Sequence, residues 1–196
     1  QGLQDLAAGR SQIAGFNFPV RVYSKAGMPR EFKKFFEDGD LTMLGFAMRI
    51  QGLAVAAGNP LEIHSMLDVS LKKARYINRA PGTGTRILCD SLLRASGIRP
   101  EEIQGYGEAA PSHKSVAAQV ALGKADAGLC IQYAADQEGA DFIPLVKEAY
   151  YLACSCAFLE SKAGSLFLET LERGAWRSRA EKLSGYDFAI LGSRAI

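Results

Sequence analysis

The feature that most constrains this chain is the regular alternation of helical segments with short apolar runs. Apolar residues at helical spacing predict helices at residues 3–7, 31–36, 63–71, 85–96, 113–122, 164–173 and 176–183. Short apolar runs predict strands at residues 13–18, 41–57, 75–78, 126–131, 141–144 and 149–158. Alternation of this kind indicates an α/β fold with mainly parallel sheets. Residues 19–31, rich in Pro, Gly and charge, are expected to form a loop.

Composition narrows the class of protein further. With 196 residues, of which 48% are hydrophobic and 22% charged, the chain can form one large domain or two small lobes. The chain has 23 Lys and Arg residues and 21 Asp and Glu residues, which gives a net charge of +2. Positive and negative charges are too evenly matched for the chain as a whole to bind nucleic acid electrostatically. No apolar run reaches 18 residues, so we expect no membrane contact.

The four cysteines, Cys89, Cys130, Cys154 and Cys156, lack the paired spacing of a zinc site, and we expect no bound metal. Apolar neighbours around Cys89, Cys130 and Cys154 predict buried, reduced thiols. Cys154 and Cys156 fall on a predicted buried strand, a poor place for a nucleophile. The first residues show no signal peptide, and we expect a cytoplasmic setting, although a removed signal stays open.

The strongest local signal is the turn from Asn78 to Arg86, with the sequence Asn-Arg-Ala-Pro-Gly-Thr-Gly-Thr-Arg. Its glycines allow close backbone approach, and the following helix start offers unpaired N–H groups and a positive dipole end. Hydroxyls of Thr83 and Thr85 and the guanidinium of Arg86 add donors, which together suit a small tetrahedral oxyanion. A plain helix cap with a solvated Arg86 is the alternative. The spacing fits neither a P-loop nor a Rossmann fingerprint, which disfavours nucleotide binding.

A second candidate is the helix start at Ser112 and His113, where Ser112 is expected to be the cap. Its N–H groups could reach the same anion. The alternative is that Ser112 only caps the helix and that His113 is exposed and has no role in binding. Nucleophile elbows, metalloprotease helices and spaced carboxylate pairs are absent from the sequence, so we expect no catalytic residues and no enzyme. Of Tyr150 and Tyr151, alternation along a strand predicts that one faces outward.

Four segments occur in an order that is informative about the family: residues 51–60 (Gln-Gly-Leu-Ala-Val-Ala-Ala-Gly-Asn-Pro), 78–86, 123–128 and 185–187. This order resembles the periplasmic-binding-protein-like domain of the molybdate-binding type, which occurs fused to helix-turn-helix regulators and to molybdopterin biosynthesis proteins. The resemblance covers nearly the whole chain. It implies a two-lobed type II periplasmic-binding-protein-like fold that closes on a ligand about two hinge strands.

The resemblance also implies where each lobe and the hinge lie in the sequence. Lobe 1 is expected at residues 1–48 and 152–196 and lobe 2 at residues 49–151, with the hinge near residues 45–54 and 150–156. Compared with the family, the chain begins after the expected first strand and helix, and one unpaired sheet edge is then expected. Residues 22–40 are less similar to the family, so their role is open.

The resemblance places the ligand between the lobes. Its wall in lobe 2 is expected to comprise Thr83, Gly84, Thr85 and Arg86 with Ser112 and His113 beside them, and Asn17 is expected to face them from lobe 1. The ligand is expected to be a small oxyanion, molybdate or tungstate, with no cofactor. The implied function is a ligand-sensing domain of a transcriptional regulator that is a homodimer and contacts DNA through a domain outside this chain. An accessory domain of a molybdopterin-biosynthesis enzyme and a solute receptor of an ABC transporter are the alternatives.

Overall fold

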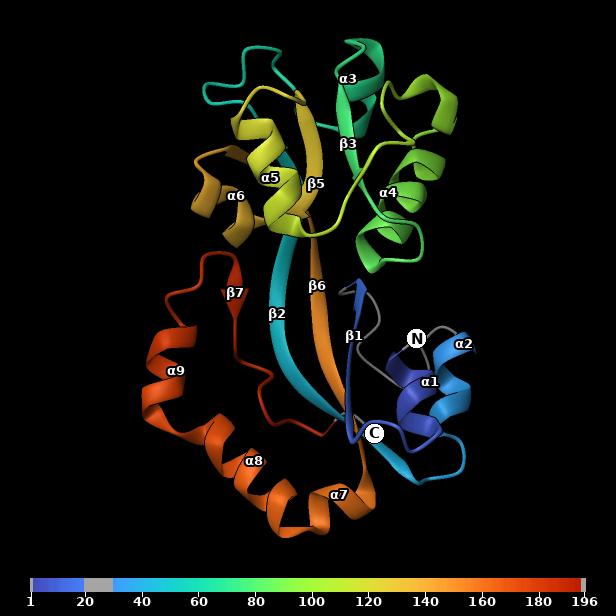
Figure 1. Cartoon of the computed structure of the whole chain (residues 1–196), viewed down its shortest axis with the longest axis vertical. Coiled ribbons are helices and arrows are strands. Elements are labelled where there is room, and N and C mark those ends of the chain that lie inside the picture. Colours follow the sequence, from blue (N-terminus) through green and yellow to red (C-terminus); the bar gives the residue numbers. More distant parts are fainter. Residues whose placement is uncertain (1, 20–29, 195–196) are drawn as a thin grey trace. The chain divides into compact units, whose positions relative to one another are not determined.

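The computed structural model describes residues 2–19 and 30–194, which form an α/β fold (Figure 1). Most of the loop expected at residues 19–31 therefore lies outside the described residues. The chain divides into two compact units: unit 1 comprises Gln1–Arg49 and Lys147–Ile196, and unit 2 comprises Ile50–Val146. Two long strands, β2 (Leu41–Val55) and β6 (Asp141–Ser155), carry the chain from one unit into the other. The lobe boundaries and the hinge expected from the resemblance stay predictions.

Unit 1 is built on the pairing of β1 with the second half of β6. Strand β1 (Ile13–Pro19) runs antiparallel to β6, from Ile13 opposite Cys154 to Pro19 opposite Glu148. The other elements of the unit are α1 (Gly2–Ala7), α2 (Arg30–Lys33), a 3-10 turn (Lys34–Phe36), α7 (Cys156–Glu160), α8 (Lys162–Glu172), α9 (Gly174–Ala180) and β7 (Tyr186–Asp187). Strand β7 pairs antiparallel with Met48 and Arg49 of β2. The ring of Phe16 lies about 6 Å from those of Phe32, Phe36 and Tyr151, and this aromatic group centres one core of unit 1.

Unit 2 has a central sheet with helices on both faces. Its elements are α3 (Met66–Leu71), β3 (Tyr76–Arg79), α4 (Gly84–Ala95), a 3-10 turn (Pro100–Glu102), β4 (Ala109–Ala110), α5 (His113–Ala121), β5 (Ala127–Ile131) and α6 (Gln132–Glu138). Strand β3 lies between β4 and β5 and is parallel to both. Strand β5 pairs antiparallel with β2, from Gln51 opposite Ile131 to Val55 opposite Ala127.

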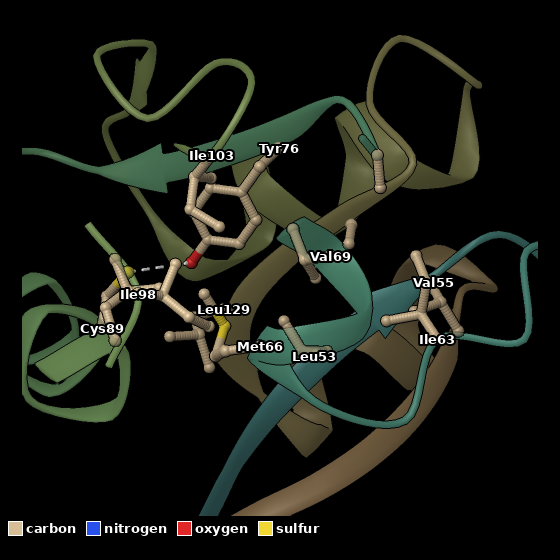
Figure 2. Packing of buried hydrophobic residues seen from close by; sticks show 13 residues of the cluster. Leu53, Val55, Ile63, Met66, Val69, Tyr76, Cys89, Ile98, Ile103 and Leu129 are labelled. Carbon is tan, nitrogen blue, oxygen red and sulfur yellow. Dashed lines mark hydrogen bonds between the residues drawn. The ribbon is translucent and has the colours of Figure 1, made fainter. Parts of the chain in front are cut away.

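Two apolar layers cover the two faces of this sheet. On one face, Leu53 and Leu129 pack with Cys89 and Leu93 of α4 and with side chains of α3, and the Tyr76 hydroxyl lies 3.5 Å from the Cys89 sulfur (Figure 2). On the other face, alanines and valines of α5 and α6 pack against Ala54, Ile77 and Cys130. Gly128 permits this second layer, because a Cβ there would lie 2.5 Å from Val116 Cγ1. Thus α4 lies on one face of the sheet, and α5 and α6 lie on the other.

Several sequence expectations need correction. The strands expected at 141–144 and 149–158 are one strand, β6, because the exposed position of Pro144 tolerates the missing N–H. That strand ends at Ser155, whose hydroxyl accepts the Phe158 N–H and starts α7, so Cys156 begins a helix rather than continuing a strand. Helix α6 was not expected, since it follows β5 directly without a side-chain cap. The expectation of mainly parallel sheets is wrong, because β1, β2, β5, β6 and β7 form antiparallel pairs.

Candidate functional site

The carboxyl ends of β3 and β4 lie side by side, with Arg79 opposite Ala110. The helix that follows β3 is α4, on one face of the sheet, whereas the helix that follows β4 is α5, on the opposite face. Adjacent parallel strands whose connections leave toward opposite faces create a crevice beyond their carboxyl ends, which is where open α/β sheets bind ligands. We call this part of unit 2 the carboxyl edge.

Helix α4 begins at the carboxyl edge with Thr83 as its cap. The Thr83 hydroxyl oxygen accepts the N–H of Arg86 at 3.3 Å and donates its own hydrogen to the carbonyl of Ala80 at 2.8 Å. The cap thereby uses the hydroxyl that the sequence offered as a ligand donor. Gly84 and Thr85 occupy the first turn, where N–H groups have no acceptor within the helix. The Thr85 side chain is buried.

The Arg86 side chain is held by groups of its own unit. Its Nε donates to Asp90 Oδ1 at 3.1 Å, and its guanidinium carbon lies 4.0 Å from the centre of the Tyr106 ring. The Tyr106 hydroxyl donates to the same Asp90 oxygen at 2.7 Å, and this hydrogen bond raises the pKa of Tyr106. Asp90 therefore balances the charge of Arg86. The role of Arg86 toward a ligand stays a prediction.

Arg79 differs from Arg86 because no described carboxylate forms an ion pair with it. Its Nη1 donates to the carbonyl of Ala110 at 3.1 Å, while its buried Nε has no hydrogen-bond partner among the described residues. Burial without a balancing acid lowers the pKa of Arg79. The neighbouring Asn78 is fully buried and fixes the backbone here, since its Oδ1 accepts the Arg79 N–H at 2.9 Å. Arg79 is thus a cation at the carboxyl edge with spare donor capacity.

Helix α5 begins with Ser112 as its cap, as the sequence predicts. The Ser112 hydroxyl accepts the N–H of Ser115 at 2.9 Å, and His113 is the first residue of the helix, with a half-buried side chain. The pairing of Arg79 with Ala110 brings the end of β3 to within three residues of this helix start. Both predicted helix starts, with the caps Thr83 and Ser112, therefore lie at the carboxyl edge together with Arg79.

Gln51 is a further polar residue of unit 2 at the carboxyl edge. It lies opposite Ile131, the last residue of β5, and its side chain is 0% exposed. Neither Nε2 nor Oε1 of this amide has a hydrogen-bond partner among the described residues. In the sequence, Gln51 stands out only as part of the segment 51–60, since a glutamine within an apolar run gives no signal that its amide is buried without partners.

In unit 1, Asn17 belongs to a buried polar group around Glu148. Asn17 Nδ2 donates to Glu148 Oε2 at 2.6 Å, and Arg49 Nε donates to the other carboxylate oxygen. The Arg49 guanidinium also lies over the ring of Tyr150, 4.9 Å from its centre. Of the tyrosine pair, Tyr151 is buried and Tyr150 is half-buried under the guanidinium of Arg49, so neither side chain is fully exposed. The predicted contact of Asn17 with a ligand stays a prediction.

All four cysteines are free, and Cys89, Cys130 and Cys154 are buried as predicted. Burial raises the pKa of Cys130 to about 12 and that of Cys154 to about 11, so these thiols stay protonated at neutral pH. Within residues 2–19 and 30–194, no three His, Cys, Asp or Glu side chains gather as metal ligands. Nor does any helix there have the length and apolar character to cross a membrane.

Unit 1 also contains a cavity of about 420 Å³ between α8, α9 and the C-terminal segment. Leu44 and Leu171 contribute apolar surface to it, and Arg177 and Arg194 contribute charge. None of the predicted site residues lines this cavity.

Comparison with known proteins agrees with this architecture. The model of the PBP superfamily domain matches residues 1–172 of the chain. The protein YvgK of Bacillus subtilis (strain 168) is 32% identical over 162 residues, which are 82% of this chain and 51% of YvgK. The chain thus spans about half the length of that relative.

Two solved structures are similar throughout. One, from Clostridium perfringens, is described as a phosphate ABC transporter substrate-binding protein with bound phosphate; it has 13% identity and a TM-score of 0.68, covering 95% of this chain and 83% of its own. The other is the regulatory domain of MetR, a LysR family regulator from N. meningitidis, with 11% identity, a TM-score of 0.63, and coverage of 96% and 79%. At such identities the likeness shows the fold, which is of the two-lobed type II periplasmic-binding-protein kind. From its sequence and its fold, the chain belongs to the PBP superfamily domain family.

Proposed function

We propose that this chain is a ligand-sensing domain that binds a small oxyanion at the carboxyl edge of unit 2. The observation that carries the proposal is Arg79, a partly buried guanidinium at the end of β3 that has no acidic partner among the described residues. The helices α4 and α5 begin after the paired ends of β3 and β4, and unpaired N–H groups with positive dipole ends at such helix starts favour a compact anion. Arg86 contributes less net charge because Asp90 balances it.

The ligand class follows from the size and charge of these groups. Molybdate and tungstate, expected from the resemblance, are compact tetrahedral oxyanions, and so is the phosphate that the Clostridium perfringens protein holds. Backbone N–H groups and one guanidinium can surround an ion of this size. We therefore take tetrahedral oxyanions as the test set.

The biological role that fits best is regulation of transcription in the cytoplasm. In this role the anion would favour one conformation of the domain, and a DNA-binding part outside this chain would respond to that shift. The likeness to the MetR regulatory domain supports it, and a homodimer is the proposed assembly. We propose no catalytic residue. A solute receptor of a transporter is the second candidate, favoured by the higher TM-score to the Clostridium perfringens protein; the molybdopterin-enzyme accessory domain has no comparable observation.

Isothermal titration calorimetry with molybdate, tungstate, sulfate and phosphate tests the proposal. The chain should bind at least one of these ions, and Arg79→Met should weaken that binding by about tenfold or more, because a charge-assisted contact is lost. Arg179→Met removes the same charge from an exposed position in unit 1 and should leave affinity unchanged. Binding that is equal in the Arg79 and Arg179 variants would exclude the carboxyl edge as the anion site.

A further inference from the structure

The unpaired amide of Gln51 needs an explanation that the anion site alone does not supply. A buried amide without partners is costly, since water would satisfy both its donor and its acceptor in the unfolded chain. Gln51 is 0% exposed, and both Nε2 and Oε1 lack partners among the described residues. An apolar side chain of the same length would avoid this cost. A residue that breaks a folding rule in this way is expected where function requires it.

The place of Gln51 in unit 2 links it to the carboxyl edge. Its partner in the ladder, Ile131, is the last residue of β5, so Gln51 stands level with the ends of the parallel strands. Alternation along β2 puts its side chain on the same face as Leu53, which is the face that α4 covers. The first turn of α4 begins at this edge of that face. The amide therefore lies on the face of the sheet on which α4 begins.

Asn78 provides an internal comparison. It is equally buried, and by the same alternation it lies on the same face, next to the end of β3. Both polar atoms of its amide nevertheless have hydrogen-bond partners. Nδ2 donates to the Tyr106 carbonyl at 3.2 Å, and Oδ1 accepts from the Arg79 N–H at 2.9 Å. This fold thus supplies partners to a buried amide that serves structure. Gln51 has none from the described part of the chain, so its partners must come from a ligand or from water.

We infer that Gln51 contacts the bound oxyanion through both amide atoms, and that the preferred ligand therefore carries a hydroxyl hydrogen. Nε2 donates to an anionic oxygen, and Oε1 accepts the hydrogen of an O–H group on the same ion. Hydrogen phosphate has both kinds of oxygen. Fully ionised sulfate, molybdate and tungstate have acceptors alone and leave Oε1 unpaired. This inference rests on the proposed function and narrows its ligand class to protonated oxyanions.

The experiment compares phosphate with sulfate and molybdate at pH 7, by calorimetry on the full 196-residue chain. We expect phosphate to bind about tenfold tighter than either fully ionised anion, the difference that one unpaired buried acceptor produces. Gln51→Met keeps the length of the side chain and removes both polar atoms, so it should reduce this ratio to near one. Gln137→Met, at an exposed position on α6, is the matched control and should retain the ratio.

A second measurement separates a ligand contact from a structural one. Without ligand, Gln51→Met should melt at a higher temperature than the wild-type chain, because an unpaired amide has been removed from a buried site. A lower melting temperature would show that the amide stabilises the fold and would overturn the inference; Gln51→Leu repeats this test with a different shape.

The outcomes also distinguish the inference from the proposed function. Tighter binding of molybdate or sulfate than of phosphate, or an unchanged ratio in Gln51→Met, overturns the role of Gln51 and leaves the anion site intact. If a folded wild-type chain binds none of the ions, both the anion site and the inference are wrong.

Discussion

Two arginines on either side of one loop show how local partners decide what a charged residue can do. Arg79 and Arg86 flank the same glycine turn, yet Asp90 and Tyr106 hold Arg86, whereas no acid in the described part of the chain pairs with Arg79. An arginine already paired with a carboxylate offers a ligand less net charge than one that is not. Spacing in the sequence made Arg86 the natural candidate, because it follows the turn at helix position three. The structure directs attention to Arg79 instead.

At the same scale, the thiols should differ sharply in reactivity. Cys130 and Cys154 are buried with pKa values raised to about 12 and about 11, whereas Cys156 is half-buried at the start of α7. At pH 8 the native chain should react with an alkylating reagent first at Cys156, and at Cys130 and Cys154 only after unfolding. Mass spectrometry of peptides from native and urea-unfolded samples measures this order. Early labelling of Cys130 would contradict the buried sheet position described here.

At the scale of elements, an ion pair joins the beginnings of β3 and β5. Asp126 accepts from the backbone N–H of Arg75 at 2.8 Å and from Arg75 Nη2 at 2.6 Å. The side-chain hydrogen bond from Arg75 is the main reason that the pKa of Asp126 is lowered. A carboxyl group whose pKa is lower in the folded chain stabilises the fold above its ordinary pKa and loses that effect as the pH falls through the folded value.

We therefore expect Asp126→Asn to lower the free energy of unfolding at pH 7, and this deficit should shrink below about pH 4. Urea unfolding at pH 7, 5 and 3 measures the difference. Asp136→Asn, at an exposed position on α6, serves as the control and should differ little from the wild-type chain at any pH. A deficit that is constant from pH 7 to 3 would mean that the carboxylate charge is not what Asp126 contributes.

The elements that sequence predicted well are those with local start and stop signals. Thr83 and Ser112 cap α4 and α5 where expected, the apolar run before α4 is β3, and the apolar run after α5 is β5. The continuous β6 and the uncapped α6 were missed because their boundaries depend on tertiary pairing and packing. The unpaired state of Gln51 and Arg79 could not be predicted either, since it depends on which residues from distant segments lie near them.

At the scale of the whole molecule, the two units differ in how the chain builds them. Unit 2 is one continuous segment, Ile50–Val146, and it contains both apolar layers of its sheet. A fragment of residues 50–146 should therefore fold by itself. Circular dichroism and a cooperative urea transition measure this, and rapid proteolysis of the whole fragment would contradict it. Unit 1 needs both Gln1–Arg49 and Lys147–Ile196, so its two segments are not expected to fold separately.

This difference has a consequence for synthesis in the cell. The ribosome releases the segment of unit 2 before the part of β6 that pairs with β1, so unit 2 can reach its native state before unit 1. Until the segment after residue 146 is released, Phe16 and Phe36 lack Tyr151, which packs with them in a core of unit 1. Chaperones that recognise exposed aromatic residues would bind Phe16 and Phe36 of the nascent chain. Truncated chains that leave these residues exposed should be degraded.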